Sequence, residues 1–469
     1  MQNEHESLLN EAQGYLQAGD ANSCRQRCLA VIEQDDNNGE AYSLLGAALS
    51  SMRMLDEAAD AFQRALTLDP DAAQAHHNLG HVLRQQGRLD EAVRCFQKAL
   101  SIDPGYGIGH QSLGIVSLML GKSEAAEQSF EQALKLIGND PYLLTYLGMA
   151  RHEQKNFTAA VDAYRAAERL NPNDPVTQAH LARTLQETGD LDAAATAYRH
   201  ALASQPDDAK LHEELASLLL ARKNAEAALA EADVCLKLIP GHGGALASRA
   251  MALYQLDRLE EADRLVDFDR FVATTTVRTP AEFSSLEDFN AALSRHVSEH
   301  PTLSFEPEGH ATRHGKHTGD LLAGEKGPIS FLQVAINKEV ETYVREHPQD
   351  TGHPFLTNSP QRWSLVMWAV IMDTQGHQLP HVHPAAWLSG VYYVKLPPVM
   401  GSGNGNHAGW IEFGRPSDNI RGDANPPVRS YKPHEGMIVL FPSYFFHRTE
   451  PFESDETRIS IAFDVMRKD

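Results

Sequence analysis

Features that would place this chain in a membrane or outside the cell are scarce. No stretch of its 469 residues approaches the roughly 18 consecutive apolar residues that a membrane-spanning helix needs, so no membrane is expected. The segment MQNEHESLLN at the amino terminus is polar and acidic, unlike a secretory signal peptide. The four cysteines form no CxxC pair, which argues against a structural zinc site and favours free thiols in a reducing, cytoplasmic setting.

Basic charge is also in short supply. The chain has 41 Lys and Arg against 63 Asp and Glu, a net charge of −22, and no basic run. Because proteins bind phosphate backbones through clustered Lys and Arg, no nucleic-acid partner is expected. An acidic surface favours a basic or neutral protein partner, although a solvated charged face is the simpler explanation.

A small residue recurs every 34 positions in the first part of the chain. The series is Ala12, Gly46, Gly80, Gly114, Gly148, Ala182, Ala216 and Ala250. From Gly46 on, an alanine follows each member after twelve residues, and proline closes five of the units. Small residues let two helices approach closely and proline ends the second helix, so each unit is predicted to be a helix–turn–helix hairpin.

This pattern resembles the tetratricopeptide repeat family across roughly residues 5–276, in eight units. One such hairpin cannot bury its apolar face alone, so neighbours stack into a superhelix with a concave side. The resemblance implies that this groove binds a protein or a peptide. A spacer or an oligomerisation arm is the alternative, and the sequence leaves the oligomeric state open. The last unit runs into DRLVDFDRF without the usual ending, as a capping or docking repeat would.

The composition changes after about residue 276, and residues 277–469 are predicted to form a second domain. All four tryptophans lie there. A loop over 274–283 and helices near 285–299 and 328–346 are expected first. Segments typical of β-strands follow, which predicts a helix-backed β-sandwich or jelly roll. These segments are RWSLVMWAVIM (362–372), WLSGVYYVKL (387–396), GWIEFG (409–414), GMIVLF (436–441) and TRISIAFDV (457–465).

Three features of this second domain stand in the order that an iron site needs. His381 and His383 are two residues apart, and alternate residues of an extended segment face one side, so both imidazoles could reach one metal ion. His447 follows another strand and could approach from the opposite side. Arg458 comes eleven residues later, with Ser460 on the same strand face. A guanidinium group matches a carboxylate, and a neighbouring hydroxyl adds a further bond.

The order HVHP…LSGVYYV…KPHEGMIVLFPS…H…RISIAF resembles the 2-oxoglutarate- and Fe(II)-dependent oxygenases, and a bacterial and phage group of them in particular. The resemblance implies a double-stranded β-helix (jelly roll) with flanking helices, and Fe(II) held by His381 and His447. It also implies that Arg458 anchors the far carboxylate of the cosubstrate 2-oxoglutarate, assisted by Ser460 and Tyr393. Ascorbate is a further cofactor that it allows.

The sequence departs from the general family at one position, because His383 stands where an Asp or Glu normally supplies the second iron ligand. A face of three histidines can hold Fe(II), and His383 could also lie just outside the ligand set. The implied activity is hydroxylation of a protein or peptide side chain, coupled to decarboxylation of 2-oxoglutarate. The alternatives are a non-catalytic scaffold, a three-histidine metal enzyme that does not use 2-oxoglutarate, and an ordinary ion pair of Arg458 with Glu450 or Asp455.

Overall fold

The computed structural model describes residues 2–306, 311–401, 407–417, 420 and 424–468 of the chain. Its contacts divide the chain into two compact units, Met1–Ser204 and Gln205–Asp469. Within the described ranges, no helix is long and apolar enough to cross a membrane. The domain bounds of 5–276 and 277–469 stay a prediction, since the division by contacts places the last helical repeats in the second unit.

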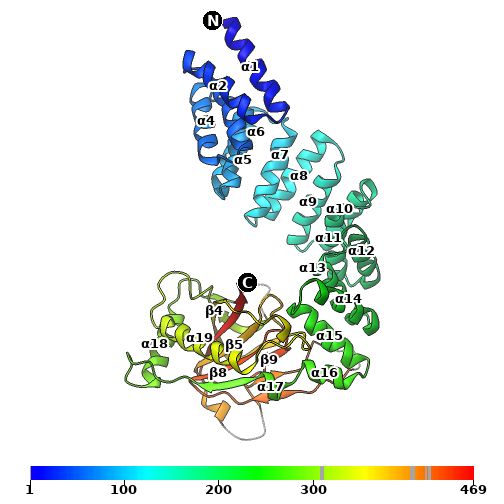
Figure 1. The fold of residues 1–469 in the computed structure, drawn as a ribbon, viewed down its shortest axis with the longest axis vertical. Helices are drawn as coiled ribbons and strands as arrows, with labels where there is room; N and C mark the ends of the chain where they lie inside the picture. The colour runs from blue at the N-terminus through cyan, green and yellow to red at the C-terminus, as the bar shows by residue number, and fades with distance from the viewer. Residues whose placement is uncertain (1, 307–310, 402–406, 418–419, 421–423, 469) are drawn as a thin grey trace. The chain divides into compact units, whose positions relative to one another are not determined.

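The first unit is built from helices that pair in sequence order as antiparallel hairpins, α1 with α2 through α11 with α12 (Figure 1). Each hairpin also packs against the next one in the unit, so the array buries one continuous apolar layer. The helices are α1 (Gln2–Gln17), α2 (Ala21–Gln34), α3 (Gly39–Ser51), α4 (Leu55–Leu68), α5 (Ala73–Gln85), α6 (Leu89–Ile102), α7 (Gly107–Met119), α8 (Ser123–Ile137), α9 (Pro141–Glu153), α10 (Phe157–Leu170), α11 (Pro175–Glu187) and α12 (Leu191–Ser204).

The recurring small residue lies where the two helices of a hairpin meet. A Cβ atom added to the glycine of four successive repeats would lie within 3 Å of an aromatic ring on the second helix. These pairs are Gly46 with Phe62 (2.9 Å), Gly80 with Phe96 (2.7 Å), Gly114 with Phe130 (2.6 Å) and Gly148 with Tyr164 (2.5 Å). The 34-residue period therefore records a glycine-on-ring contact that sets the distance between paired helices.

The substitution Gly114→Ala should destabilise the repeats. Its methyl group would overlap the buried ring of Phe130, an overpacking that costs about 1–3 kcal/mol and outweighs the gain of up to about 1 kcal/mol in helix propensity. Gly14→Ala is the matched control, because nothing lies within 4 Å of that position in α1 and only the propensity gain applies. Urea unfolding followed by circular dichroism measures both. Equal or higher stability of Gly114→Ala would contradict the contact.

The second unit begins with two more helical hairpins and continues into a sheet with flanking helices. Its helices are α13 (Ala209–Ala221), α14 (Ala225–Leu238), α15 (Gly243–Gln255), α16 (Leu259–Leu265), α17 (Phe268–Phe271), α18 (Leu286–Ser298) and α19 (Ile329–Glu346), with short 3₁₀ turns η1 (Leu356–Asn358) and η2 (Pro398–Gly401). Its strands are β1 (Ala273–Thr276), β2 (Ser304–Phe305), β3 (Thr312–His317), β4 (Trp363–His381), β5 (Leu388–Lys395), β6 (Ile411–Phe413), β7 (Arg429–Tyr431), β8 (Met437–Pro442), β9 (His447–Thr449) and β10 (Arg458–Arg467).

All paired strands of this sheet are antiparallel, in the order β1-β8-β5-β10-β4-β9-β6-β7, with β3 also against β4. The long strand β4 makes the sheet curl. Its first half pairs with β10, and its second half, beyond a bend at Gln375 (φ 61°), pairs with β9. The predicted fold class, a tetratricopeptide superhelix followed by a jelly-roll-like domain, is confirmed.

Helices α18 and α19 cover the outer face of the β4–β10–β5 layer. The hydroxyl of Tyr392 donates to Asn290 Oδ1 (2.6 Å), and Trp363 Nε1 donates to Asn337 Oδ1 (2.9 Å). Both predicted helices and all five predicted strand segments are present. The prediction of a loop over 274–283 was partly wrong, because the first residues of this segment complete β1, which pairs with β8 at the sheet edge. The sequence also gave no sign of β3, whose residues are mostly polar.

The last repeat is held by buried side chains from α19 and from loops beside the sheet. The last carbonyl groups of any helix lack partners within it, so those of α16 and α17 need donors from elsewhere. Tyr444, just after β8, donates to Leu265 O (2.5 Å), and Tyr343, in α19, donates to Phe271 O (3.0 Å). His347 and His353 contribute two similar bonds, to the carbonyls of residues 270 and 264. The unusual ending of the last repeat is thus attached to α19 and the neighbouring loops.

Candidate metal and 2-oxoglutarate site

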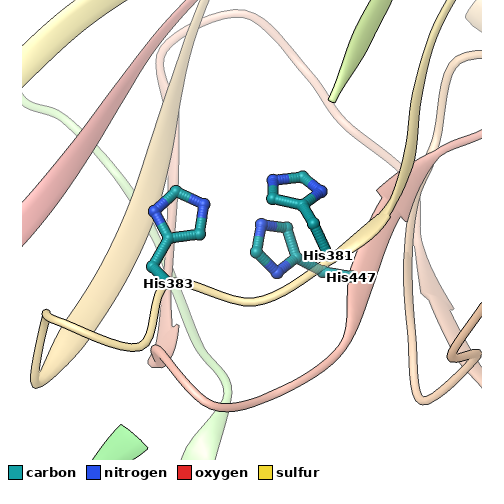
Figure 2. Close-up of side chains that lie close together, drawn as sticks. All are labelled: His381, His383 and His447. Carbon is teal, nitrogen blue, oxygen red and sulfur yellow. The ribbon is translucent and has the colours of Figure 1, made fainter. Parts of the chain in front are cut away.

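Three histidines gather at one end of the curled sheet. His381 is the last residue of β4, and its register partner on β9 is His447, so the two rings lie 4.2 Å apart between centroids. His383 follows after one residue and is held by its backbone N–H, which donates to Ser443 O (2.9 Å). One nitrogen from each ring can be chosen so that all three lie within 4.8 Å of one another (Figure 2). The structure brings together all the residues predicted as metal ligands.

Each imidazole uses Nδ1 to donate a hydrogen bond. The acceptor for His381 is Leu379 O (2.7 Å), and the acceptor for His447 is Phe445 O (3.0 Å). Nδ1 of His383 lies 2.9 Å from the carboxylate of Asp464. Carbonyl and carboxylate oxygens carry no hydrogen, so Nδ1 must be protonated in each ring. In a ring that carries this single proton, Nε2 is left with a free lone pair, as a metal ligand requires.

Burial keeps two of these rings neutral. Burial first, and the nearby His383 ring second, lower the pKa of His381 to about 4. Burial likewise holds the pKa of His447 well below the ordinary value of 6.5, with His381 and His383 adding to the effect. Neutral imidazole is the form that binds a metal, so no proton has to leave these rings at neutral pH.

A buried arginine lies in the same cavity. Arg458, on β10, is 2% exposed, and it has no carboxylate partner among the described residues. It donates to Ser460 Oγ (3.1 Å), and its guanidinium carbon lies 5.1 Å from the ring centroid of Tyr393. The Arg458 Nε and the Tyr393 hydroxyl are both buried without a hydrogen-bond partner of good geometry. The alternative of an ordinary ion pair with Glu450 fails, since Glu450 pairs with Arg448.

Alternation along the strands explains why these side chains meet. Arg458 and Ser460 are two residues apart on β10, and Ser460 pairs in register with Tyr393 on β5, so all three face inward. Tyr392 points to the other face and packs under α18, as the alternation predicts. Apolar residues such as Val370, Val391 and Phe441 line the cavity between the arginine and the histidines.

In this conformation the cavity measures about 30 Å³, room for about one water molecule, so a larger ligand enters only when neighbouring side chains move.

Sequence reasoning missed three polar residues near the site. Gln378 and Thr449 face each other across β4 and β9, and a hydrogen bond of 3.1 Å joins their side chains. Asp464 binds His383. Asp464 could have been found from its even spacing to Arg458 along β10, because that spacing puts both residues on one strand face. Asp373 and Glu412 are two acidic residues of this domain that could have replaced the missing carboxylate ligand. Within the described part of the chain, neither of them joins the group of three histidines.

Metal binding by this cluster should tolerate mild acid. Because burial lowers the pKa of His381 to about 4 and holds that of His447 well below the ordinary value of 6.5, protons should compete with the metal at these two rings only in distinctly acidic solution. Co(II) affinity, followed by visible absorption under anaerobic conditions, should stay constant from about pH 8 to about pH 6 and fall below about pH 5. His447→Ala should abolish tight binding, whereas His434→Ala, at an exposed loop histidine, should not. A loss of affinity centred near the ordinary histidine pKa would contradict the burial of these ligands.

Comparisons with known proteins match two parts of this chain. A family model described as "Putative 2OG-Fe(II) oxygenase" matches residues 366–464. Tetratricopeptide repeat models match residues 39–72, 71–137, 113–175 and 151–218. No curated protein sequence matches the chain.

Several solved structures are similar to this chain, all with TM-scores below 0.5. In the APC/C hetero-tetramer Cut9–Hcn1, one chain is 20% identical, with 52% of this chain and 48% of that chain covered and a TM-score of 0.41. PilF of Pseudomonas aeruginosa is 21% identical (44% and 93% covered, TM-score 0.40). YrrB, described as a TPR protein with an unusual peptide-binding site, is 24% identical (41% and 98% covered, TM-score 0.37). From the family models, the chain joins tetratricopeptide repeats to a carboxy-terminal domain of the 2OG-Fe(II) oxygenase family.

Proposed function

We propose that this protein is a 2-oxoglutarate- and Fe(II)-dependent dioxygenase that hydroxylates a protein or peptide recruited by its repeats. The observation that carries the proposal is the buried guanidinium of Arg458, which has no carboxylate partner among the residues that the structure describes and shares a cavity with three imidazoles. An unpaired buried charge is costly, so a fold keeps one only where an anion completes it. A dicarboxylate that also chelates a metal supplies this anion.

The residues present fit both missing groups. His381, His447 and His383 would hold the iron through their free Nε2 atoms, and imidazole suits Fe(II). The buried Tyr393 hydroxyl and Arg458 Nε, each without a partner, offer hydrogen bonds to a carboxylate beside Ser460. When bound, iron with 2-oxoglutarate and O₂ supplies the oxidising chemistry, which yields succinate, CO₂ and a hydroxylated substrate.

The chain's own residues position these groups and exclude water. Arg458 and Tyr393 orient the far end of the cosubstrate, while the two carbonyl acceptors of His381 and His447 fix their rings for the metal. Val370, Val391 and Phe441 keep the space between them apolar, which strengthens each electrostatic contact.

A polymeric substrate is favoured by the attachment of the last repeats to the metal-site loop. A Cβ atom on Gly243, the first residue of α15, would lie 2.8 Å from Pro384 O, directly after His383. Arg467, at the end of β10, donates to Pro240 O (3.2 Å) and Gly241 O (3.4 Å) in the loop before α15. A polypeptide bound along the final repeats would therefore be held next to the loop that carries His383.

Anaerobic titration with Fe(II) and then 2-oxoglutarate tests the cosubstrate assignment. The wild-type protein should develop the weak visible charge-transfer band of a chelated keto acid and should form succinate slowly when air is admitted. Arg458→Ala should weaken 2-oxoglutarate binding by at least about 30-fold, because one partner of a buried charge pair is lost. Tyr393→Phe and Ser460→Ala should weaken it less, by roughly 5- to 10-fold, the effect of losing one hydrogen bond.

Arg429→Ala removes an exposed arginine paired with Asp269 and serves as the control for loss of charge. If the wild-type protein gives neither the band nor succinate, the β-domain is a non-catalytic scaffold and the proposal is rejected. If the band forms equally in Arg458→Ala, the anchor is misassigned.

A further inference from the structure

The third histidine differs from the other two in its hydrogen-bond acceptor. His381 and His447 donate to neutral backbone carbonyls, whereas His383 donates to the Asp464 side chain over 2.9 Å. His383 also occupies the position at which, according to the resemblance of the HxH motif, the general family has a carboxylate ligand. His383, which stands in place of the acidic ligand, is therefore the ring that is hydrogen-bonded to an acidic residue, Asp464.

Asp464 is itself held in place. Ser389, its register partner on β5, donates to Asp464 Oδ1 over 2.6 Å, so the carboxylate has two donors on two different elements. The side chains of His383 and Asp464 are only 17% and 16% exposed. The indole of Trp368 stacks on the imidazole of His383, with centroids 5.8 Å apart and planes at 18°. Packing and hydrogen bonds therefore leave the His383 ring little freedom to rotate.

The register of the sheet makes this contact specific. Asp464 lies six residues after Arg458 on β10, so both side chains lie on the same face of the strand, with Ser460 and Ala462 between them. This strand face thereby presents a cation inside the cavity and, farther along, an anion beside His383. The anion, Asp464, is next to the three histidines, and the cation, Arg458, is next to the Tyr393 hydroxyl.

We propose that Asp464 is a positioning residue that makes His383 the third metal ligand and supplies the negative charge that the missing carboxylate ligand would have brought. A carboxylate that accepts a hydrogen bond from Nδ1–H fixes the tautomer with Nε2 free. It also orients the imidazole ring and raises its basicity. The site then carries one acidic group, as in the general family, but the imidazole ring of His383 stands between it and the metal. This inference rests on the proposed metal site and does not require 2-oxoglutarate.

The competing interpretation is a plain His–Asp ion pair beside a two-histidine metal site. In that case His383 would be protonated at both nitrogens and could not bind a metal. The two interpretations differ in the number of imidazoles on the metal and in the coupling between positions 383 and 464, and both quantities can be measured without turnover.

The test is anaerobic Co(II) titration of the full-length protein without 2-oxoglutarate, with pulsed electron paramagnetic resonance of the Cu(II)-loaded protein to count the imidazole ligands. Asp464→Asn should weaken Co(II) binding by about 10- to 100-fold, as loss of such a hydrogen-bond partner typically does. His383→Gln should weaken binding by at least as much and reduce the imidazole count from three to two. The double variant should bind no more weakly than His383→Gln alone, because Asp464 acts through that ring.

Glu456→Gln is the matched control for loss of a carboxylate, because Glu456 is exposed and pairs with Lys395, and its Co(II) affinity should change less than about twofold. An unchanged Co(II) affinity in Asp464→Asn, effects that add fully in the double variant, or two imidazoles in the wild-type protein would each overturn the proposal. If Asp464→Asn fails to fold, Ser389→Ala replaces it, since it removes a single bond to the same carboxylate. A drop of at least about threefold in Co(II) affinity would then support the proposal, and no change would overturn it.

The two proposals can fail separately. Wild-type protein that binds Co(II) in a manner dependent on Asp464, but shows no 2-oxoglutarate band, would keep this inference and reject the oxygenase. A normal 2-oxoglutarate band with no effect of Asp464→Asn on Co(II) binding would do the reverse.

Discussion

The alternation of side chains along strand β10 is the constraint on which the site depends. This strand is hydrogen-bonded on both sides, to β4 and to β5, so it can neither slip nor twist without breaking two ladders. Every second side chain from Arg458 to Asp464 must therefore lie on one face of the strand, where Arg458, Ser460 and Ala462 line the cavity. A shift of one residue would turn the guanidinium out under the helices and bring Ile459 inside. The buried charge is possible because the register is fixed in this way.

Strand β4 adds the second half of the geometry. Its bend sends the first half of the strand against β10 and the second half against β9. The same strand therefore carries Trp368 and Val370 at the cavity wall and His381 in the group of three histidines. Curling the sheet converts residues that are distant along the chain into direct register partners, as with His381 and His447.

The electrostatic character of the site follows from what burial permits. Neutral imidazole ligands would leave a divalent ion with its full charge, whereas a carboxylate ligand would cancel part of it. In this protein the acidic group lies behind an imidazole, and Ser389 and the packing around Trp368 hold it there. Such an arrangement would keep an anion close to a bound metal and leave the coordination positions to nitrogen. The cation at the opposite end of the cavity is free to take a second, external anion.

The sequence by itself determined the helical repeats and most strands, because both depend on local periods. Glycine recurs every 34 positions from Gly46 to Gly148, where it permits a close contact between paired helices. Period-two alternation likewise predicts the strand faces of Arg458, Ser460 and Tyr393. The strand β3 was beyond this reasoning, since polar residues carry no apolar period. Tertiary structure alone decided that His381 and His447 pair across two strands, that Arg458 has no acidic partner within the described part of the chain, and that Asp464 reaches His383. These contacts join segments dozens of residues apart, and a pattern in sequence specifies which face a side chain occupies but not which side chain it meets there.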